Sequence, residues 1–248
     1  MSHYYYLGNA LEKIDKDCVV SSVVKLDANE SHHLLNVCRT RIGDTIFAFG
    51  SNRRFHVEVV SIEKKFVYVK ILDEITDTKV KKHSICCAIP VLKGGKTEYL
   101  IEKLTELDID RIVVFSSERT IVKDLDTAKL ERYNRVALEA AKQSERFCLP
   151  LLKVANSIPN AISAMEIKRD ETVVAIEREK TSLFSHCLES LGTQNFGLVS
   201  GPEGGFTSQE IELLSSMGHA VTLGKSILRA ETAAFVMAVG VKMHLGEF

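Results

Sequence analysis

The pattern of apolar and polar residues divides the chain into two parts. In the first seventy residues, short β-branched runs alternate with turn residues such as Gly43-Asp44 and Gly50-Ser51-Asn52. Closely spaced short strands of this kind are typical of a small β-barrel. The expected strand residues are Val19-Val20, Val23-Val24, Thr45–Phe49, Arg54–Val60 and Phe66–Leu72, with a short helix at Glu30–Val37.

After a polar segment at Asp73–His83, strand-like runs alternate with helical patterns. The expected strands are Ser84–Leu92, Arg111–Phe115, Val173–Ile176, Phe196–Ser200 and Ala220–Leu223. The expected helices are Thr97–Leu107, Leu130–Arg146, Glu231–Leu245 and one that runs to Ser216 from a capping box at Thr207–Glu210. This alternation predicts an α/β fold with a largely parallel sheet. We therefore expect two domains, a β-barrel at 1–74 and an α/β domain at 84–248.

Composition narrows the class of protein without revealing its function. Hydrophobic residues make up 45% of the chain and charged residues 26%, which is typical of a globular protein. The net charge of −1 means that any contact with RNA must use a local basic patch. The longest apolar run, Phe235–Val241, is far too short to span a membrane, and Met1–Tyr6 does not resemble a signal peptide. The six cysteines lack CxxC spacing, so we expect free thiols in the cytoplasm and no metal site.

Two segments resemble part of a nucleotide-binding loop but fail its spacing. Gly95-Lys96-Thr97 and Gly224-Lys225-Ser226 each follow a strand-like run. A phosphate-binding loop also needs a glycine five residues before its second glycine, and Pro90 and His219 occupy those positions. The dinucleotide pattern GxGxxG does not occur in the sequence. A nucleotide triphosphatase and a Rossmann dehydrogenase are therefore disfavoured.

Two glycine-rich segments near the carboxyl terminus are candidates for a ligand site. Val199–Thr207 (VSGPEGGFT) lies between an expected strand and a capped helix, and Leu223–Ala234 (LGKSILRAETAA) leads into the last helix. Glycine allows the backbone to approach a ligand closely, and loops after parallel strands are where open α/β sheets bind ligands. A tight turn and a simple helix start explain the same residues, so the residues alone leave both readings open.

These two segments together resemble the signature of the RsmE family of SPOUT-class methyltransferases, which make N3-methyluridine in 16S (small-subunit) ribosomal RNA. Val91–Lys96, Ser117-Glu118-Arg119 and Ala140–Ser144 resemble further blocks of that family, and His33–Asp44 resembles its PUA-like RNA-binding barrel. The sequence departs from the family at four positions. The family usually has proline where this sequence has Lys225, and threonine where it has Ala230. It has an acidic residue where this sequence has Lys142, and glycine where it has Asp108.

The resemblance implies a SPOUT domain with a trefoil knot behind a PUA-like barrel, and a homodimer whose two chains share the active site. It implies S-adenosylmethionine as cofactor, held by the residues that follow: Ile176, Gly201, Pro202, Gly204, Gly205, Leu223, Gly224, Ile227 and Leu228. Glu177-Arg178 is expected to follow Ile176 in a third wall of the site. The candidates for RNA contacts are Arg39, Arg41, Arg53, Arg54, Lys93, Arg119 and Arg146.

Transfer of a methyl group to N3 of uracil requires that N3 lose its proton before or during the attack. A cation that stabilises the uracil anion, or a base, would assist this step. Arg229 is the leading candidate for the cation or for anchoring a phosphate, and Glu203 is a candidate base that could instead cap the next helix. Two alternatives stay open: a SPOUT methyltransferase acting on another RNA such as transfer RNA, and a non-catalytic RNA-binding module of the same fold.

Overall fold

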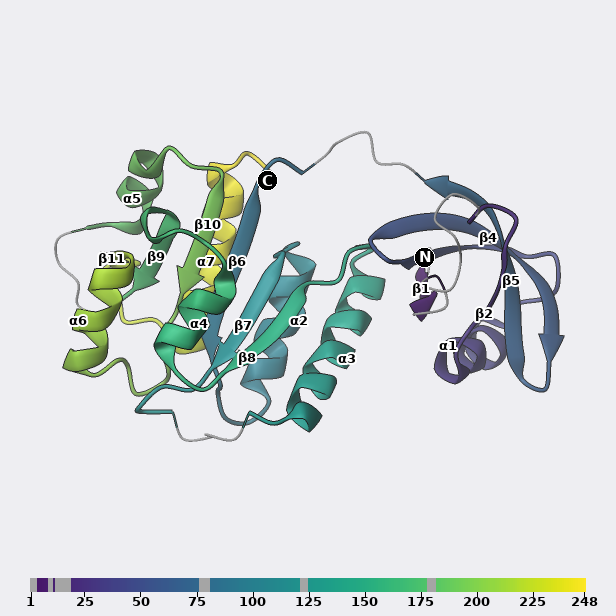
Figure 1. The fold of residues 1–248 in the computed structure, drawn as a ribbon, viewed down its shortest axis with the longest axis horizontal. Helices are drawn as coiled ribbons and strands as arrows, with labels where there is room; N and C mark the ends of the chain where they lie inside the picture. The colour runs from purple at the N-terminus through teal and green to yellow at the C-terminus, as the bar shows by residue number, and fades with distance from the viewer. Residues whose placement is uncertain (1–3, 9–10, 12–18, 76–80, 121–124, 178–181) are drawn as a thin grey trace. The chain divides into compact units, whose positions relative to one another are not determined.

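The computed structural model describes residues 4–8, 11, 19–75, 81–120, 125–177 and 182–248, which form two compact units (Figure 1). The first unit takes its described residues from 1–80 and from Ala141–Leu149, and the second takes them from 81–140 and 150–248. Ala141–Leu149, which was expected in the α/β domain, thus belongs to the first unit. No helix within the described ranges is long and apolar enough to cross a membrane.

The first unit is built on a five-stranded sheet in the order β1-β3-β4-β5-β2. Its strands are β1 (Tyr4–Tyr6), β2 (Val23–Lys25), β3 (Thr45–Gly50), β4 (Arg53–Glu63) and β5 (Phe66–Ile75). Neighbouring strands are antiparallel except β1, which pairs in parallel with β3. Two register shifts between β4 and β5 bend this pair, and the sheet curls around a core that includes Phe55, Val57 and Leu34 (Figure 1).

The expected helix at Glu30–Val37 is confirmed but begins earlier. Asp27 accepts a hydrogen bond from the Glu30 backbone at 2.8 Å and caps α1 (Ala28–His32). A π-helical segment, η3 (His33–Cys38), follows directly. Glu30 is only 3% exposed, and its carboxylate lies 2.7 Å from Lys142 Nζ within the same unit. The acidic partner of Lys142 explains why a lysine is accommodated at this position.

The second unit is a three-layer α/β structure around a six-stranded sheet in the order β11-β9-β10-β6-β7-β8. Every neighbouring pair is parallel, as expected from the sequence. The strands are β6 (Ser84–Pro90), β7 (Arg111–Phe115), β8 (Leu151–Ala155), β9 (Thr172–Ala175), β10 (Asn195–Val199) and β11 (His219–Val221). The expected strands are confirmed, and β8 is an additional strand at one edge.

Helices cover both faces of this sheet (Figure 1). They are α2 (Lys96–Glu106), α3 (Thr127–Gln143), α4 (Ile158–Met165), α5 (Phe184–Leu191), α6 (Ser208–Met217) and α7 (Ala230–His244), with a 3-10 turn η4 (Arg169–Glu171). Ile85, Cys87 and Ile89 of β6 pack with α2, α3, α5 and α7. Cys86 and Ala88, on the opposite face of the same strand, pack with α4 and α6.

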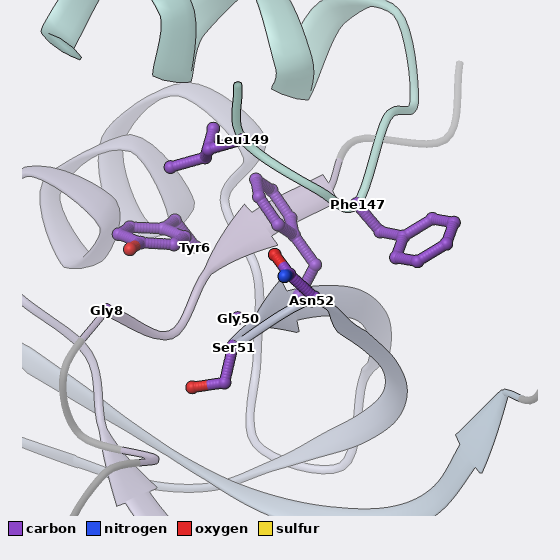
Figure 2. Close-up of a pocket in the computed structure, with 8 residues that line it drawn as sticks. Tyr6, Gly8, Gly50, Ser51, Asn52, Phe147 and Leu149 are labelled. Atoms are coloured by element: carbon purple, nitrogen blue, oxygen red, sulfur yellow. The ribbon is translucent and has the colours of Figure 1, made fainter. Parts of the chain in front are cut away.

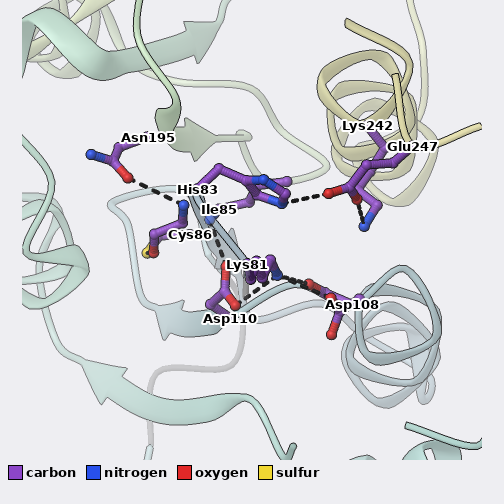
Figure 3. A network of polar contacts seen from close by, with 10 residues as sticks. Lys81, His83, Ile85, Cys86, Asp108, Asp110, Asn195, Lys242 and Glu247 are labelled. Carbon is purple, nitrogen blue, oxygen red and sulfur yellow. Dashed lines mark hydrogen bonds and ion pairs between the residues drawn. The ribbon is translucent and has the colours of Figure 1, made fainter. Parts of the chain in front are cut away.

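Polar contacts fix the start of the second unit (Figure 3). Lys81 Nζ lies 3.0 Å from the Asp108 carboxylate and 2.7 Å from that of Asp110. His83 Nε2 lies 2.7 Å from Glu247 Oε1 near the carboxyl end of the chain. Lys81 and His83, which were expected in a polar linker, are thus part of the folded unit. Residues 76–80 of that segment lie outside the described residues.

Candidate functional site

The two glycine-rich segments lie at one edge of the parallel sheet. Gly201–Gly205 follow β10, and Leu223–Leu228 follow β11. β9 lies between these strands, and Ile176 and Glu177 follow its end. Because all carboxyl ends of parallel strands face the same edge, the loops after β9, β10 and β11 are neighbours. The structure therefore brings together the three walls that were expected to hold the cofactor, although Arg178 lies outside the described residues.

The loop after β10 has a conformation that depends on glycine. Gly205 has φ +66°, and its backbone N–H donates to Pro202 O at 2.9 Å to close the turn. A Cβ atom at Gly205 would lie 3.8 Å from the Glu177 carboxylate, so the loops after β9 and β10 face each other here. A Cβ atom at Gly201 would lie only 3.0 Å from the buried ring of Phe206. A side chain at either position would therefore disturb the loop.

Arg119, an expected RNA contact, lies against this loop. Its Nη1 atom donates to Gly204 O at 2.9 Å and approaches Phe206 O at 3.5 Å. A Cβ atom at Gly204 would lie 3.3 Å from Arg119 Cβ, so the two residues are in close contact. The guanidinium therefore holds the backbone of the glycine loop in place.

The carboxylate of Glu210 ties the same loop to its surroundings. Thr207 and Glu210 form the expected capping box of α6, in which Glu210 accepts from the Thr207 backbone at 2.8 Å. The other carboxylate oxygen accepts from the Glu118 backbone at 2.8 Å. One side chain thus joins the start of α6 to the segment that carries Arg119.

Lys96 joins two parts of the site through ion pairs. Lys96 is the first residue of α2, and its Nζ atom lies 3.0 Å from Glu203 Oε1 and 3.3 Å from Glu231 Oε1. Glu203 belongs to the loop after β10, and Glu231 lies in the first turn of α7. Glu203, and then Glu231, raise the pKa of Lys96. Glu203 is therefore already engaged by a cation in this structure.

The loop after β11 presents apolar and basic side chains. Its backbone turns at Gly224, where φ is +135° and the space next to the α-carbon is open. Leu223 and Leu228 are partly buried, whereas Ile227 is 60% exposed. Arg229 is exposed and precedes α7, and within the described part of the chain its guanidinium has no hydrogen bond or ion pair. It is thus a cation available to a substrate.

A buried polar atom also points to a ligand at this edge. Ser200, the residue directly after β10, is 2% exposed. Its backbone N–H donates to Ala88 O, but its hydroxyl oxygen has no hydrogen-bond partner among the described residues. A buried hydroxyl without a partner costs about 1–3 kcal/mol, and a polar ligand would remove this cost. This hydroxyl, together with the open backbone at Gly224, fits the expected cofactor.

The sequence did not single out Lys96, Ser200 or Glu231 as site residues. Lys96 lay in the failed phosphate loop and in a block that resembles the family, and Ser200 lay in the glycine-rich segment Val199–Thr207, but neither was assigned a role. The available signal was position, since both follow strands of a parallel sheet, where ligands bind. Among the described residues, no group of three or more His, Cys, Asp or Glu side chains is arranged to hold a metal ion.

The expected RNA contacts occupy different environments. Arg39, Arg41 and, in the second unit, Lys93 are exposed. Arg53 instead makes a two-pronged ion pair with Glu74, which neutralises its charge. That pairing weakens the case for Arg53 as a phosphate contact.

Arg54 and Arg146 differ from the exposed group. The Arg54 guanidinium lies over the Phe147 ring, 4.6 Å from its centroid. Arg146 is only 8% exposed, and its backbone N–H donates to Ala141 O. This burial weakens the case for Arg146 as an RNA contact, because a buried guanidinium does not reach a phosphate in this conformation.

Comparison with known proteins adds independent findings. A family model described as "RNA methyltransferase domain" matches residues 79–241, and one described as "RNA methyltransferase PUA domain" matches residues 26–72. The chain is 32% identical over 219 residues to the ribosomal RNA small subunit methyltransferase E of Bacillus subtilis, covering 84% of this chain and 85% of the relative.

Solved structures agree with these sequence matches. The ribosomal RNA small subunit methyltransferase E from Neisseria gonorrhoeae, bound to S-adenosyl methionine, is 26% identical with a TM-score of 0.80. A probable rRNA-methyltransferase from Porphyromonas gingivalis is 26% identical with a TM-score of 0.82. Each comparison covers 98% of both chains.

Proposed function

This chain belongs to the RNA methyltransferase family, and we propose that it methylates N3 of a uridine in small-subunit ribosomal RNA. Its methyl donor is S-adenosylmethionine, and its substrate class is small-subunit ribosomal RNA. The observation that supports a working site best is the meeting of three loops at the ends of β9, β10 and β11, together with the buried Ser200 hydroxyl, which has no hydrogen-bond partner in the described part of the chain.

The residues that would hold S-adenosylmethionine belong to these loops. When bound, it supplies an electrophilic methyl group on a sulfonium. The backbone from Gly201 to Gly205 and the Ser200 hydroxyl offer polar contacts, and Leu223, Ile227 and Leu228 offer apolar surface. Ile176, at the end of β9, adds an apolar side chain that is buried in this structure.

Arg229 is the residue that we assign to the uracil anion. An exposed guanidinium that has no partner among the described residues can face negative charge that develops as N3 loses its proton. Glu203 is less available as a base, because its carboxylate is already engaged by Lys96 Nζ at 3.0 Å. We therefore assign Glu203 to holding the loop after β10, and Arg229 to the chemical step.

The proposal includes a homodimer in the cytoplasm with a knotted carboxyl-terminal segment and an active site that both chains share. Phe235, Val236 and Met243 of α7 expose apolar surface, which is typical of a helix that meets another chain. Ile227 is exposed in the same way next to Arg229. A monomer in light scattering at working concentration would contradict the shared site.

The test is methyl transfer to small-subunit ribosomal RNA that lacks the modification, followed by mapping of the methylated base. We expect label at N3 of one uridine, and label on transfer RNA alone would overturn the substrate. S-adenosylmethionine at about 100 times its Kd should stabilise the fold by ~2.7 kcal/mol, and the absence of any thermal shift would favour a non-catalytic RNA-binding module.

Two substitutions separate the chemical step from cofactor binding. We expect Arg229→Ala to abolish most methyl transfer while S-adenosylmethionine still raises Tm. Lys225→Ala, at an exposed cation in the same loop, is the matched control and should retain activity. Unchanged turnover in Arg229→Ala would contradict the assigned role.

A further inference from the structure

The first unit contains a cavity that the proposed methyl-transfer site does not use (Figure 2). Its volume is about 180 Å³, and all its lining residues belong to this unit. Tyr6, Phe49 and Phe147 contribute aromatic rings, Leu149 adds an apolar side chain, and Ser51 and Asn52 add polar ones. Flat apolar walls are thus combined with a small number of polar groups.

The polar residues of the cavity come from a tight hairpin turn. Ser51 and Asn52 form the two-residue turn between β3 and β4, with φ of 49° and 59°. Both central residues of such a turn are left-handed, a conformation that asparagine tolerates better than most residues. The turn thus contributes two residues with polar side chains to the lining of the cavity.

The chemistry of the lining matches a nucleobase. Bases of unpaired RNA stack on aromatic side chains and form hydrogen bonds along their edges. The Asn52 amide offers both donors and an acceptor, as reading a base edge requires. Arg54, whose guanidinium lies over the Phe147 ring, places a positive charge next to the lining. A purely apolar ligand would make no use of the amide or of this charge.

We propose that this cavity binds one unpaired base of an RNA substrate. The inference rests on the proposed function, because it takes RNA as the substrate. It goes beyond that function, because the cavity lies in the first unit whereas the glycine loops lie in the second. The bound base is therefore additional to the one that is methylated.

The experiment measures binding of a fluorescently labelled, single-stranded RNA from the mapped target region to the full-length protein. Asn52→Gly removes the amide and relieves the left-handed strain, so we expect Tm to be unchanged or higher while RNA binding weakens about 3- to 10-fold. Phe147→Ala removes an aromatic wall and should weaken binding about 5- to 100-fold. Ser21→Gly is the matched control, since Ser21 is uncharged and left-handed in the same unit but does not line the cavity.

Abasic RNA provides a second measurement that depends on the base itself. An oligonucleotide of the same length with abasic residues should bind the wild-type protein and Asn52→Gly equally. Equal affinity of the wild type, Asn52→Gly and Phe147→Ala for normal RNA would overturn the inference while leaving methyl transfer intact. A wild-type protein that neither binds nor methylates RNA would instead overturn the proposed function.

Discussion

One substitution can separate two interpretations of Arg119: that it contacts RNA, and that it positions the loop after β10. A basic residue in a family block was expected to contact RNA, but the structure places its guanidinium on the backbone of the loop after β10, with Nη1 2.9 Å from Gly204 O. We expect Arg119→Ala to loosen this loop and to weaken S-adenosylmethionine binding. RNA affinity should change little.

The size of this effect follows from the contact. A hydrogen bond from a charged donor contributes about 1.5–3 kcal/mol to stability when buried. Arg119 is exposed, so solvent screening reduces the value to about 0.5–1 kcal/mol. Since ~1.4 kcal/mol is tenfold in an equilibrium constant, Kd for the cofactor should rise about 2- to 5-fold.

Titration calorimetry with S-adenosylmethionine, and KM values for the cofactor and for RNA, measure the two roles separately. Lys93→Ala is the matched control, because Lys93 is an exposed cation in the same unit and was also an expected RNA contact. We expect Lys93→Ala to raise KM for RNA only. If Arg119→Ala raises KM for RNA and leaves cofactor affinity unchanged, the positioning role is wrong.

Two further predictions concern backbone conformation and a buried ion pair. Gly205→Ala should strain the loop at φ +66°, lower the free energy of unfolding by about 1–2 kcal/mol and weaken cofactor binding. Gly192→Ala, at φ +56° beyond α5, should lower Tm only. Burial already raises the pKa of Glu30 above 4.5, and Lys142→Met removes the ammonium group that opposes this shift. The folded state of the variant therefore favours protonated Glu30, and its stability falls as pH rises through the raised pKa. In urea unfolding, we expect Lys142→Met to lower the free energy of unfolding by about 3–5 kcal/mol at pH 8 and by less at pH 5. A loss that does not depend on pH, and that persists when Glu30→Gln is added, would contradict this.

The sequence predicted most of the strongly patterned elements and missed β1, β8, α4 and α5. The apolar runs that became β6, β7, β9, β10 and β11 were recognised because buried parallel strands are almost continuously apolar. β8 lies at the sheet edge and contains Lys153 among its five residues, so its pattern is less clear. α5 begins at Phe184 without a side-chain cap, and thus lacked a start signal.

Two departures from the family pattern acquire a physical explanation only from tertiary structure. Asp108 follows α2 with φ +56°, a conformation that glycine adopts freely and aspartate tolerates better than most residues. Its carboxylate is then used by Lys81. Lys142 similarly meets the buried Glu30, which is 112 positions away in the sequence. Nothing in the structure explains Lys225.

The assignment of chemical roles also depends on contacts between residues that are far apart in the sequence. Spacing along the chain excluded Lys96 from a phosphate-binding loop, but it could not show that α2 brings this lysine to Glu203 and Glu231. That contact bears on the proposed mechanism, because a carboxylate already engaged by an ammonium is less available to a substrate. We therefore propose that the positive charge of Arg229, which has no such partner among the described residues, is the main means of stabilising a uracil anion. Loss of Glu203 should therefore affect cofactor binding more than the pH dependence of kcat, and loss of Arg229 should do the reverse.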